Sequence, residues 1–175
     1  MRNFVRACCV LMLLASAVAG QTDQWKRYQY SDGNFSALFP LEPQDSVNKS
    51  DGEIKSHTLM AQQTGGVFMV VYSSMQSEQK VDDATYQVFK EAVFRELPKC
   101  DVVTEQPPSL PLTSYIGHWY RLNCALANGN IPIVGNLYWG KHYAYAVMAM
   151  FSAANTEPQA TKNFVNSFAL LEPAK

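Results

Sequence analysis

The chain has 175 residues, with 14 Lys and Arg against 15 Asp and Glu, a net charge of −1. Hydrophobic residues make up 47% of it, which is enough to form the core of one domain of the usual ~100 to 150 residues. This near-neutral balance excludes the strongly basic surface that nucleic acid or anionic lipid would require.

The first 20 residues have the pattern of a secretory signal peptide. Two arginines precede an apolar run, and small residues lead to an A-x-A-like cleavage site at Ala19, Gly20 and Gln21. The apolar run is shorter than the ~20 residues that a membrane-spanning helix needs. Cleavage leaves 12 Lys and Arg against 15 Asp and Glu, a net charge of −3. We therefore expect a signal peptide over 1–20 and a single exported domain over 21–175, periplasmic or secreted and without a membrane span.

The first half of the mature chain is predicted to form short strands separated by turns. Residues 25–40 indicate two strands around a Ser-Asp-Gly turn, and the second strand places Phe35 and Phe39 on one face, where we expect them to be buried. The prolines that follow end this strand, because proline cannot donate to a ladder. Two further strands, 53–62 and 67–75, are predicted to form a hairpin.

Two segments change to helical periodicity. Over 81–97 the apolar residues recur at helical spacing, Asp82 is suited to cap the N-terminus, and Pro98 ends the helix. A second, shorter helix is predicted over 157–168, where Thr156 is suited to begin a capping box.

Between the two helices the pattern returns to strands. The predicted ranges are 101–105, 115–126, 131–139 and 142–151. Turns at Asn128-Gly129 and Gly140-Lys141 would join the last three strands into a meander.

These elements predict an α+β fold: an antiparallel sheet of about six or seven strands, with one helix on one face and the other on the opposite face or at the edge. Together with the motif FSALFPLEP at 35–43 and the pattern around 164–170, their order resembles the PsbP-like fold family. That family includes extrinsic photosynthetic proteins and exported bacterial proteins of unknown function. The resemblance implies a sandwich of an antiparallel sheet flanked by helices, and it supplies no catalytic motif.

Two cysteines, Cys100 and Cys124, remain after the leader is removed. Because export favours disulfides, we expect these residues to be bonded to each other. The alternative is a pair of buried free thiols, since cysteine is often a small core residue. No Cys-x-x-Cys spacing indicates a redox or zinc site.

Catalytic motifs are lacking in the sequence: there is no phosphate-binding glycine loop, no G-x-S-x-G and no H-E-x-x-H. We therefore expect a non-enzymatic protein without cofactor or metal. The predicted turns align His118, Trp139 and His142 in one cross-strand row, a candidate polar site. The two histidines would lie roughly 10 Å apart, too far to share one zinc ion. The row is either a polar end of a packed sheet or a site in which His118 or His142 acts as a general base.

The period of two sorts the meander into two faces. The face expected to be core beneath a helix carries Ile116, Tyr120, Leu122, Cys124, Ile133, Leu137, Met148 and Met150. The opposite face, here called the aromatic face, carries Tyr115, Trp119, Arg121, Asn123, Asn136, Tyr138, Tyr143, Tyr145 and Phe151. Tyr and Trp combine apolar area with a polar group, as binding surfaces do. The candidate surface for a small-molecule ligand or a protein partner therefore consists of Trp119, Arg121, Tyr138, Tyr143 and Tyr145. The alternative is a second core face, covered by the C-terminal helix.

Overall fold

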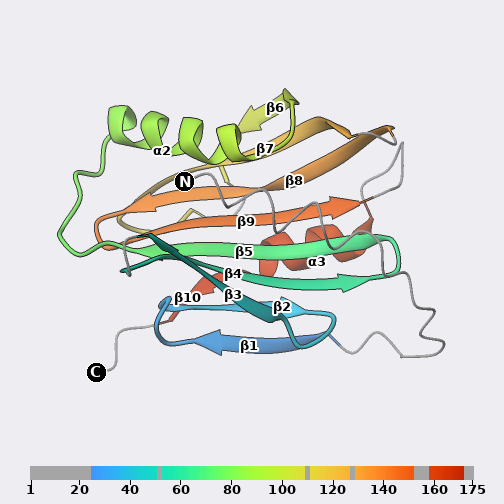
Figure 1. Ribbon diagram of the computed structural model, residues 1–175, viewed down its shortest axis with the longest axis horizontal. Helices are drawn as coiled ribbons and strands as arrows, with labels where there is room; N and C mark the ends of the chain where they lie inside the picture. The colour runs from blue at the N-terminus through green and yellow to red at the C-terminus, as the bar shows by residue number, and fades with distance from the viewer. Residues whose placement is uncertain (1–24, 51–52, 109–110, 127–128, 152–157, 172–175) are drawn as a thin grey trace.

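The computed structural model describes residues 25–50, 53–108, 111–126, 129–151 and 158–171 (Figure 1). The expected signal peptide and its cleavage residues Ala19, Gly20 and Gln21 lie outside the described residues, as does the expected helix cap Thr156. Within those ranges, no helix has both the length and the apolar character needed to cross a membrane.

The described elements are β1 (Lys26–Tyr30), β2 (Phe35–Phe39), β3 (Gln44–Ser50), β4 (Glu53–Gln63), β5 (Gly66–Ser74), α2 (Asp83–Glu96), β6 (Cys100–Gln106), β7 (Tyr115–Leu126), β8 (Gly129–Gly140), β9 (Tyr143–Phe151), α3 (Gln159–Ser167) and β10 (Ala169–Leu170). They form a seven-stranded sheet in the order β3-β4-β5-β9-β8-β7-β6 and a three-stranded sheet in the order β1-β2-β10. All the paired strands are antiparallel, so the structure is of the predicted α+β type.

The first hairpin does not join the large sheet, and this separation was not predicted. Strand β2 instead pairs with β1 on one side and with the C-terminal β10 on the other. Phe35 and Phe39 are both 0% exposed, as predicted, because they pack between the two sheets. The sequence also did not indicate β3, whose polar residues lie at the edge of the large sheet and lack an apolar alternation.

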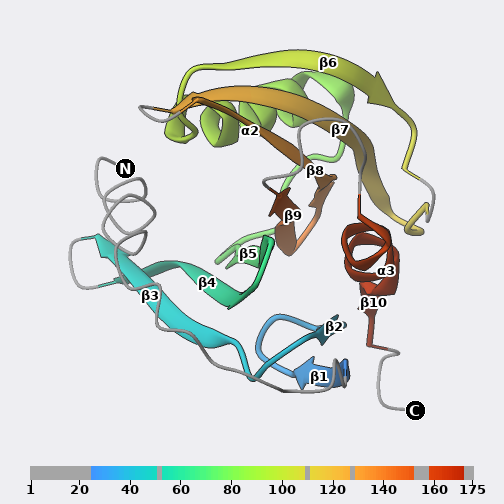
Figure 2. The ribbon, with the colours of Figure 1, turned by 90° about the vertical axis from the view of Figure 1, so that its right-hand side faces the viewer.

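The two helices lie on opposite sides of the large sheet (Figure 2). Helix α2 packs on β7 and β8, and α3 packs on β2, β9, β8 and β5. Two cores result. One is buried under α2, and the other lies between the large sheet and the layer formed by α3 with β1 and β2.

Strands β7, β8 and β9 form the predicted meander, but both registers differ from the predicted ones by two residues. His118 pairs with Leu137 and not with Trp139, and Trp139 pairs with Ala144 and not with His142. The expected cross-strand row of His118, Trp139 and His142 is therefore wrong. The two faces remain as sorted, because a shift of two residues leaves each side chain on the same side of the sheet.

The expected disulfide joins Cys100 and Cys124, which face each other on neighbouring strands β6 and β7 with Cα atoms 3.9 Å apart. It ties the edge strand β6, which directly follows α2, to the interior of the large sheet. The bond closes a segment with a sequence separation of 24 residues.

Candidate functional site

The centre of the aromatic face is core, where Asn136, Tyr138, Tyr145 and Phe151 are buried. Tyr138 and Tyr145 are 1% and 0% exposed, and Phe168 at the end of α3 packs on both rings at 5.8 and 5.1 Å between centroids. The expectation that these two tyrosines present a surface is therefore wrong. The physical reason is that α3 and the first hairpin supply enough apolar side chains to cover this second face of the sheet.

Three residues of the candidate surface keep part of their area accessible. Trp119, Arg121 and Tyr143 are half-buried, with Trp119 and Tyr143 packed against the margin of the core. Trp119 and Arg121 lie on β7, the strand next to β8 on the side away from β9. They therefore stand at the β6–β7 end of the face that α3 covers.

A line of directly paired residues crosses this margin. On β6, Gln106 pairs with Trp119, which pairs in turn with Asn136 on β8. We call these three residues the edge row. Gln106 is exposed, Trp119 is half-buried and Asn136 is 0% exposed, so the row leads from solvent into the core.

Asn136 is an unusual core residue. Neither its Nδ2 nor its Oδ1 has a hydrogen-bond partner among the described residues. Its cross-strand neighbour on the other side is Val147, and its neighbours along β8 on the same face are Val134 and Tyr138, so the amide is set among side chains of the hydrophobic core. A buried amide left without partners costs about 1 to 3 kcal/mol, and such groups are rare in folded proteins.

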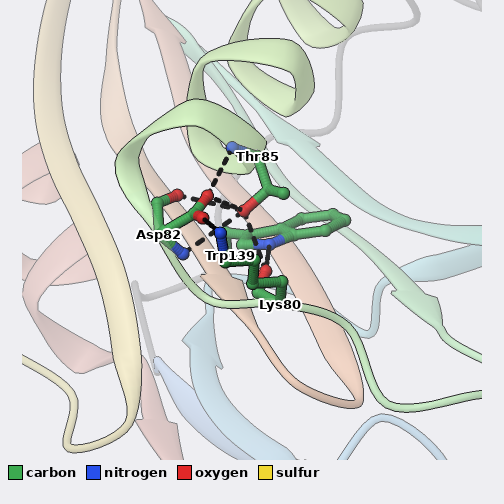
Figure 3. Close-up of polar contacts among 4 residues, drawn as sticks. All are labelled: Lys80, Asp82, Thr85 and Trp139. Atoms are coloured by element: carbon green, nitrogen blue, oxygen red, sulfur yellow. Dashed lines mark hydrogen bonds and ion pairs between the residues drawn. The ribbon is translucent and has the colours of Figure 1, made fainter.

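Trp139 anchors the start of α2 and does not belong to a histidine site (Figure 3). Its indole Nε1 donates a hydrogen bond to the Lys80 carbonyl at 2.9 Å. Asp82 is the N-cap, as predicted, and forms a capping box with Thr85. The hydrogen bond from the Lys80 ammonium, followed by that from the Thr85 backbone, lowers the pKa of Asp82 to about 2.

His142 lies at the β8–β9 turn. Its Nε2 is 3.6 Å from the Glu78 carboxylate, and the two side chains are 56% and 65% exposed. Such a solvent-exposed pair contributes little to stability, and its surroundings provide no enclosed site for proton transfer.

His118 belongs to a polar cluster between α2 and the β6–β7 edge of the sheet, formed by Tyr86, Lys90, Glu105, His118 and Tyr120. The hydroxyls of Tyr86 and Tyr120 are 2.9 Å apart, and Tyr120 donates to Glu105 Oε1 at 2.9 Å. Nζ of Lys90 lies 3.5 Å from Glu105 Oε2. Nδ1 of His118 lies 2.9 Å from Oε1, but this buried nitrogen does not have hydrogen-bond geometry, so we treat the contact as electrostatic.

Burial and the carboxylate of Glu105 shift the pKa values within this polar cluster. Burial raises the pKa of both Tyr86 and Tyr120 well above the ordinary range, so both phenols remain protonated and able to donate. Burial favours the neutral form of Glu105, but the hydrogen bond from Tyr120 and the charges of Lys90 and His118 outweigh it. The pKa of Glu105 is therefore lower than usual.

A third contact between a histidine and a carboxylate was not predicted either. Nδ1 of His57 lies 3.1 Å from Asp45 Oδ2, and the imidazole stacks on Tyr72 at 4.7 Å between centroids. Burial, followed by the charge of Asp45, raises the pKa of Tyr72 to about 12. This contact lies near the β3 edge of the large sheet, opposite the edge that carries the polar cluster.

Sequence reasoning missed the carboxylate partners of His118 and His57. Glu105 ends the predicted strand 101–105, but its link to Tyr86 runs through Tyr120 and requires α2 to pack on β7. Asp45 lies in β3, which was not predicted. Asn136 had been assigned to its face correctly. An amide between Val134 and Tyr138 in period two was the only signal of a polar group in the core.

Among the described residues, no three His, Cys, Asp or Glu side chains gather closely enough to hold a metal ion. Comparison with models of protein families finds no match to this chain, and comparison with curated proteins finds none either.

Proposed function

We propose that this protein is an exported, non-enzymatic binding or accessory protein, and that it takes its ligand or partner at the edge row and the adjacent Arg121. The observation that carries the proposal is the row itself: an exposed amide, a half-buried indole and a buried amide without a partner, aligned across three strands. Amide, indole and guanidinium groups form hydrogen bonds and stacking contacts, but their ionisation state does not change near neutral pH. Their chemistry therefore favours recognition over catalysis.

Export is supported by the leader pattern of the sequence and by the disulfide, which is typical of oxidising compartments. We expect N-terminal sequencing of the protein from the periplasm or culture medium to begin at Gly20 or Gln21. A chain that retains its first 19 residues would contradict this part of the proposal.

The binding role is tested by capture from the native extracellular or periplasmic fraction with the mature protein as bait. We expect Trp119→Ala and Arg121→Ala to reduce the amount captured. The melting temperature should stay close to that of the wild type for Arg121→Ala and fall for Trp119→Ala, because the indole packs against the core. Val88→Ala is the matched control, because Val88 is 70% exposed on α2, away from the edge row. Equal capture by all variants would contradict the proposal.

An enzymatic role for His118 is the second candidate, favoured by Glu105 at 2.9 Å from its Nδ1. A carboxylate that accepts a hydrogen bond from an imidazole orients the ring, as general-base sites require. The contact here is electrostatic, so this role requires the imidazole to turn until its Nδ1 donates to Glu105. The test is a panel of hydrolase substrates with the wild type, His118→Asn and Glu105→Gln. Activity that both substitutions lower would favour this candidate, and activity that neither substitution affects would exclude it.

We also propose that the fold is PsbP-like. The support is the strand that ends in Phe39-Pro40 and the antiparallel sheet with a helix on each side. An experimental structure that superposes on members of that family through β4 to β9 and both helices would test it.

A further inference from the structure

Asn136 indicates the chemistry of the missing partner. A primary amide presents two N–H donors and a carbonyl acceptor, and here both polar atoms are buried in a hydrophobic core without a partner among the described residues. One ligand group can pair with both ends of this side chain: a secondary amide donates its N–H to Oδ1 and accepts from Nδ2. Val134 and Val147 flank the position and would contact a small apolar substituent, such as a methyl group, on the ligand amide.

The position of Asn136 favours a terminal amide over one inside a chain. Because the side chain is 0% exposed, a ligand group must enter end-on between neighbouring side chains. A peptide group within a polypeptide continues as chain on both sides and cannot enter in this way. An acetamido group ends in a methyl and can.

The rest of the edge row fits the ring that carries such a group. Trp119 lies one strand from Asn136 and is half-buried, so one part of its indole is available for stacking. Gln106, an exposed residue, lies beyond Trp119 on β6, and the half-buried Arg121 lies two residues along β7, so both can offer polar groups to hydroxyls. An apolar ring face with hydroxyls at its rim is the chemistry of a sugar.

We propose that the edge row binds an N-acetylated amino sugar. The acetamido group pairs with Asn136, the sugar ring stacks on Trp119, and Arg121 and Gln106 hydrogen-bond to the hydroxyls. This inference rests on the proposed binding function and names its ligand class. The indole of Trp119 shifts when the acetamido group enters, because Asn136 is fully covered without the ligand.

The test is calorimetric titration of the mature, disulfide-bonded protein with the trimer of N-acetylglucosamine, with intrinsic tryptophan fluorescence as a second readout. We expect saturable binding and a fluorescence change that is absent in Trp119→Phe. Cellotriose, which has the same linkage but no acetamido group, should bind roughly tenfold or more weakly, since about one net hydrogen bond or more is lost.

Asn136→Leu separates a binding role from a structural one. Leucine has the same branching and no unpaired polar atoms, so we expect the melting temperature to stay equal or rise while affinity for the trimer falls roughly tenfold or more. Asn136→Val is a smaller apolar replacement, for use if leucine overfills the position. A marked fall in melting temperature in both variants would show that the amide has a structural role and would overturn the proposal.

Three other outcomes would also overturn it: no binding of the trimer, equal binding of cellotriose, or tighter binding of an acetylated dipeptide. None of these results refutes the binding function itself. If capture from the native fraction still depends on Trp119, the edge row is a binding site for another class of ligand. If capture does not depend on Trp119 either, then both the proposed ligand class and the proposed binding function of the edge row are wrong.

Discussion

The ring of Tyr138 lies against the backbone of Gly117, its direct partner on the neighbouring strand. A Cβ atom added at Gly117 would be 2.5 Å from ring atom Cδ1 of Tyr138 and 2.9 Å from the Leu137 carbonyl oxygen. Glycine is therefore required here by the close approach of a buried aromatic ring. We expect Gly117→Ala to destabilise the protein by about 1 to 3 kcal/mol, as overpacking does, in denaturant unfolding.

The same ring provides the control. In a Tyr138→Leu background, the penalty of Gly117→Ala should fall, because the shorter side chain leaves room for the methyl group. Equal penalties in both backgrounds would mean that the backbone of β8, and not the ring, sets the requirement for glycine.

The hydroxyl of Tyr145 joins the large sheet to the turn of the first hairpin. It donates a buried hydrogen bond of 2.7 Å to the Gly33 carbonyl, 112 residues away in the chain. Tyr145→Phe leaves this carbonyl without the donor, and we expect a loss of about 1 to 3 kcal/mol in the free energy of unfolding. Tyr143→Phe, a half-buried tyrosine on the same face, is the matched control and should change stability by less than about 0.5 kcal/mol.

Glu105 should make the free energy of unfolding depend on pH in the acid range. Its folded pKa is lower than the ordinary 4.5, so the unfolded chain binds this proton more readily than the folded one. The contribution of the carboxylate is therefore complete above pH 4.5 and lost as the pH falls through the folded pKa. Unfolding of the wild type and Glu105→Gln, compared at several pH values, should show a stability difference that shrinks across this window.

Glu91→Gln controls for the general effect of removing an acidic residue, since Glu91 is exposed on α2. Its difference from the wild type should stay flat over the same range. A difference for Glu105→Gln that does not change with pH would contradict the assignment of Glu105 as the charged centre of the polar cluster.

The Cys100–Cys124 bond should hold the β6 edge in place. In the chain-entropy model, closing a loop of this length stabilises the fold by about 3 kcal/mol. We expect reductant to lower the unfolding midpoint correspondingly. Thiol titration of the unfolded, unreduced protein that begins at residue 21 should find no free thiol. Two titratable thiols would show that the cysteines are not bonded in the native protein.

The sequence by itself determined the local elements and the side of the sheet that each residue occupies. Helix α2 begins after Asp82, as predicted, because capping and helical periodicity depend on neighbours a few residues apart. The eight residues assigned to the core face of the meander all lie in the core beneath α2, since alternation is a property of a single strand. The disulfide was expected because removal of the predicted leader would leave only two cysteines.

Only the tertiary structure decided the strand register of the meander and whether its aromatic face is covered. A shift of two residues leaves every side chain on its original side, so the hydrophobic pattern could not distinguish His118 opposite Leu137 from His118 opposite Trp139. Tyr138 and Tyr145 became core because α3 and the first hairpin, distant in sequence, pack over them. Asn136 was placed on its face by alternation, but its burial without a partner depends on that same long-range packing, which no local pattern encodes.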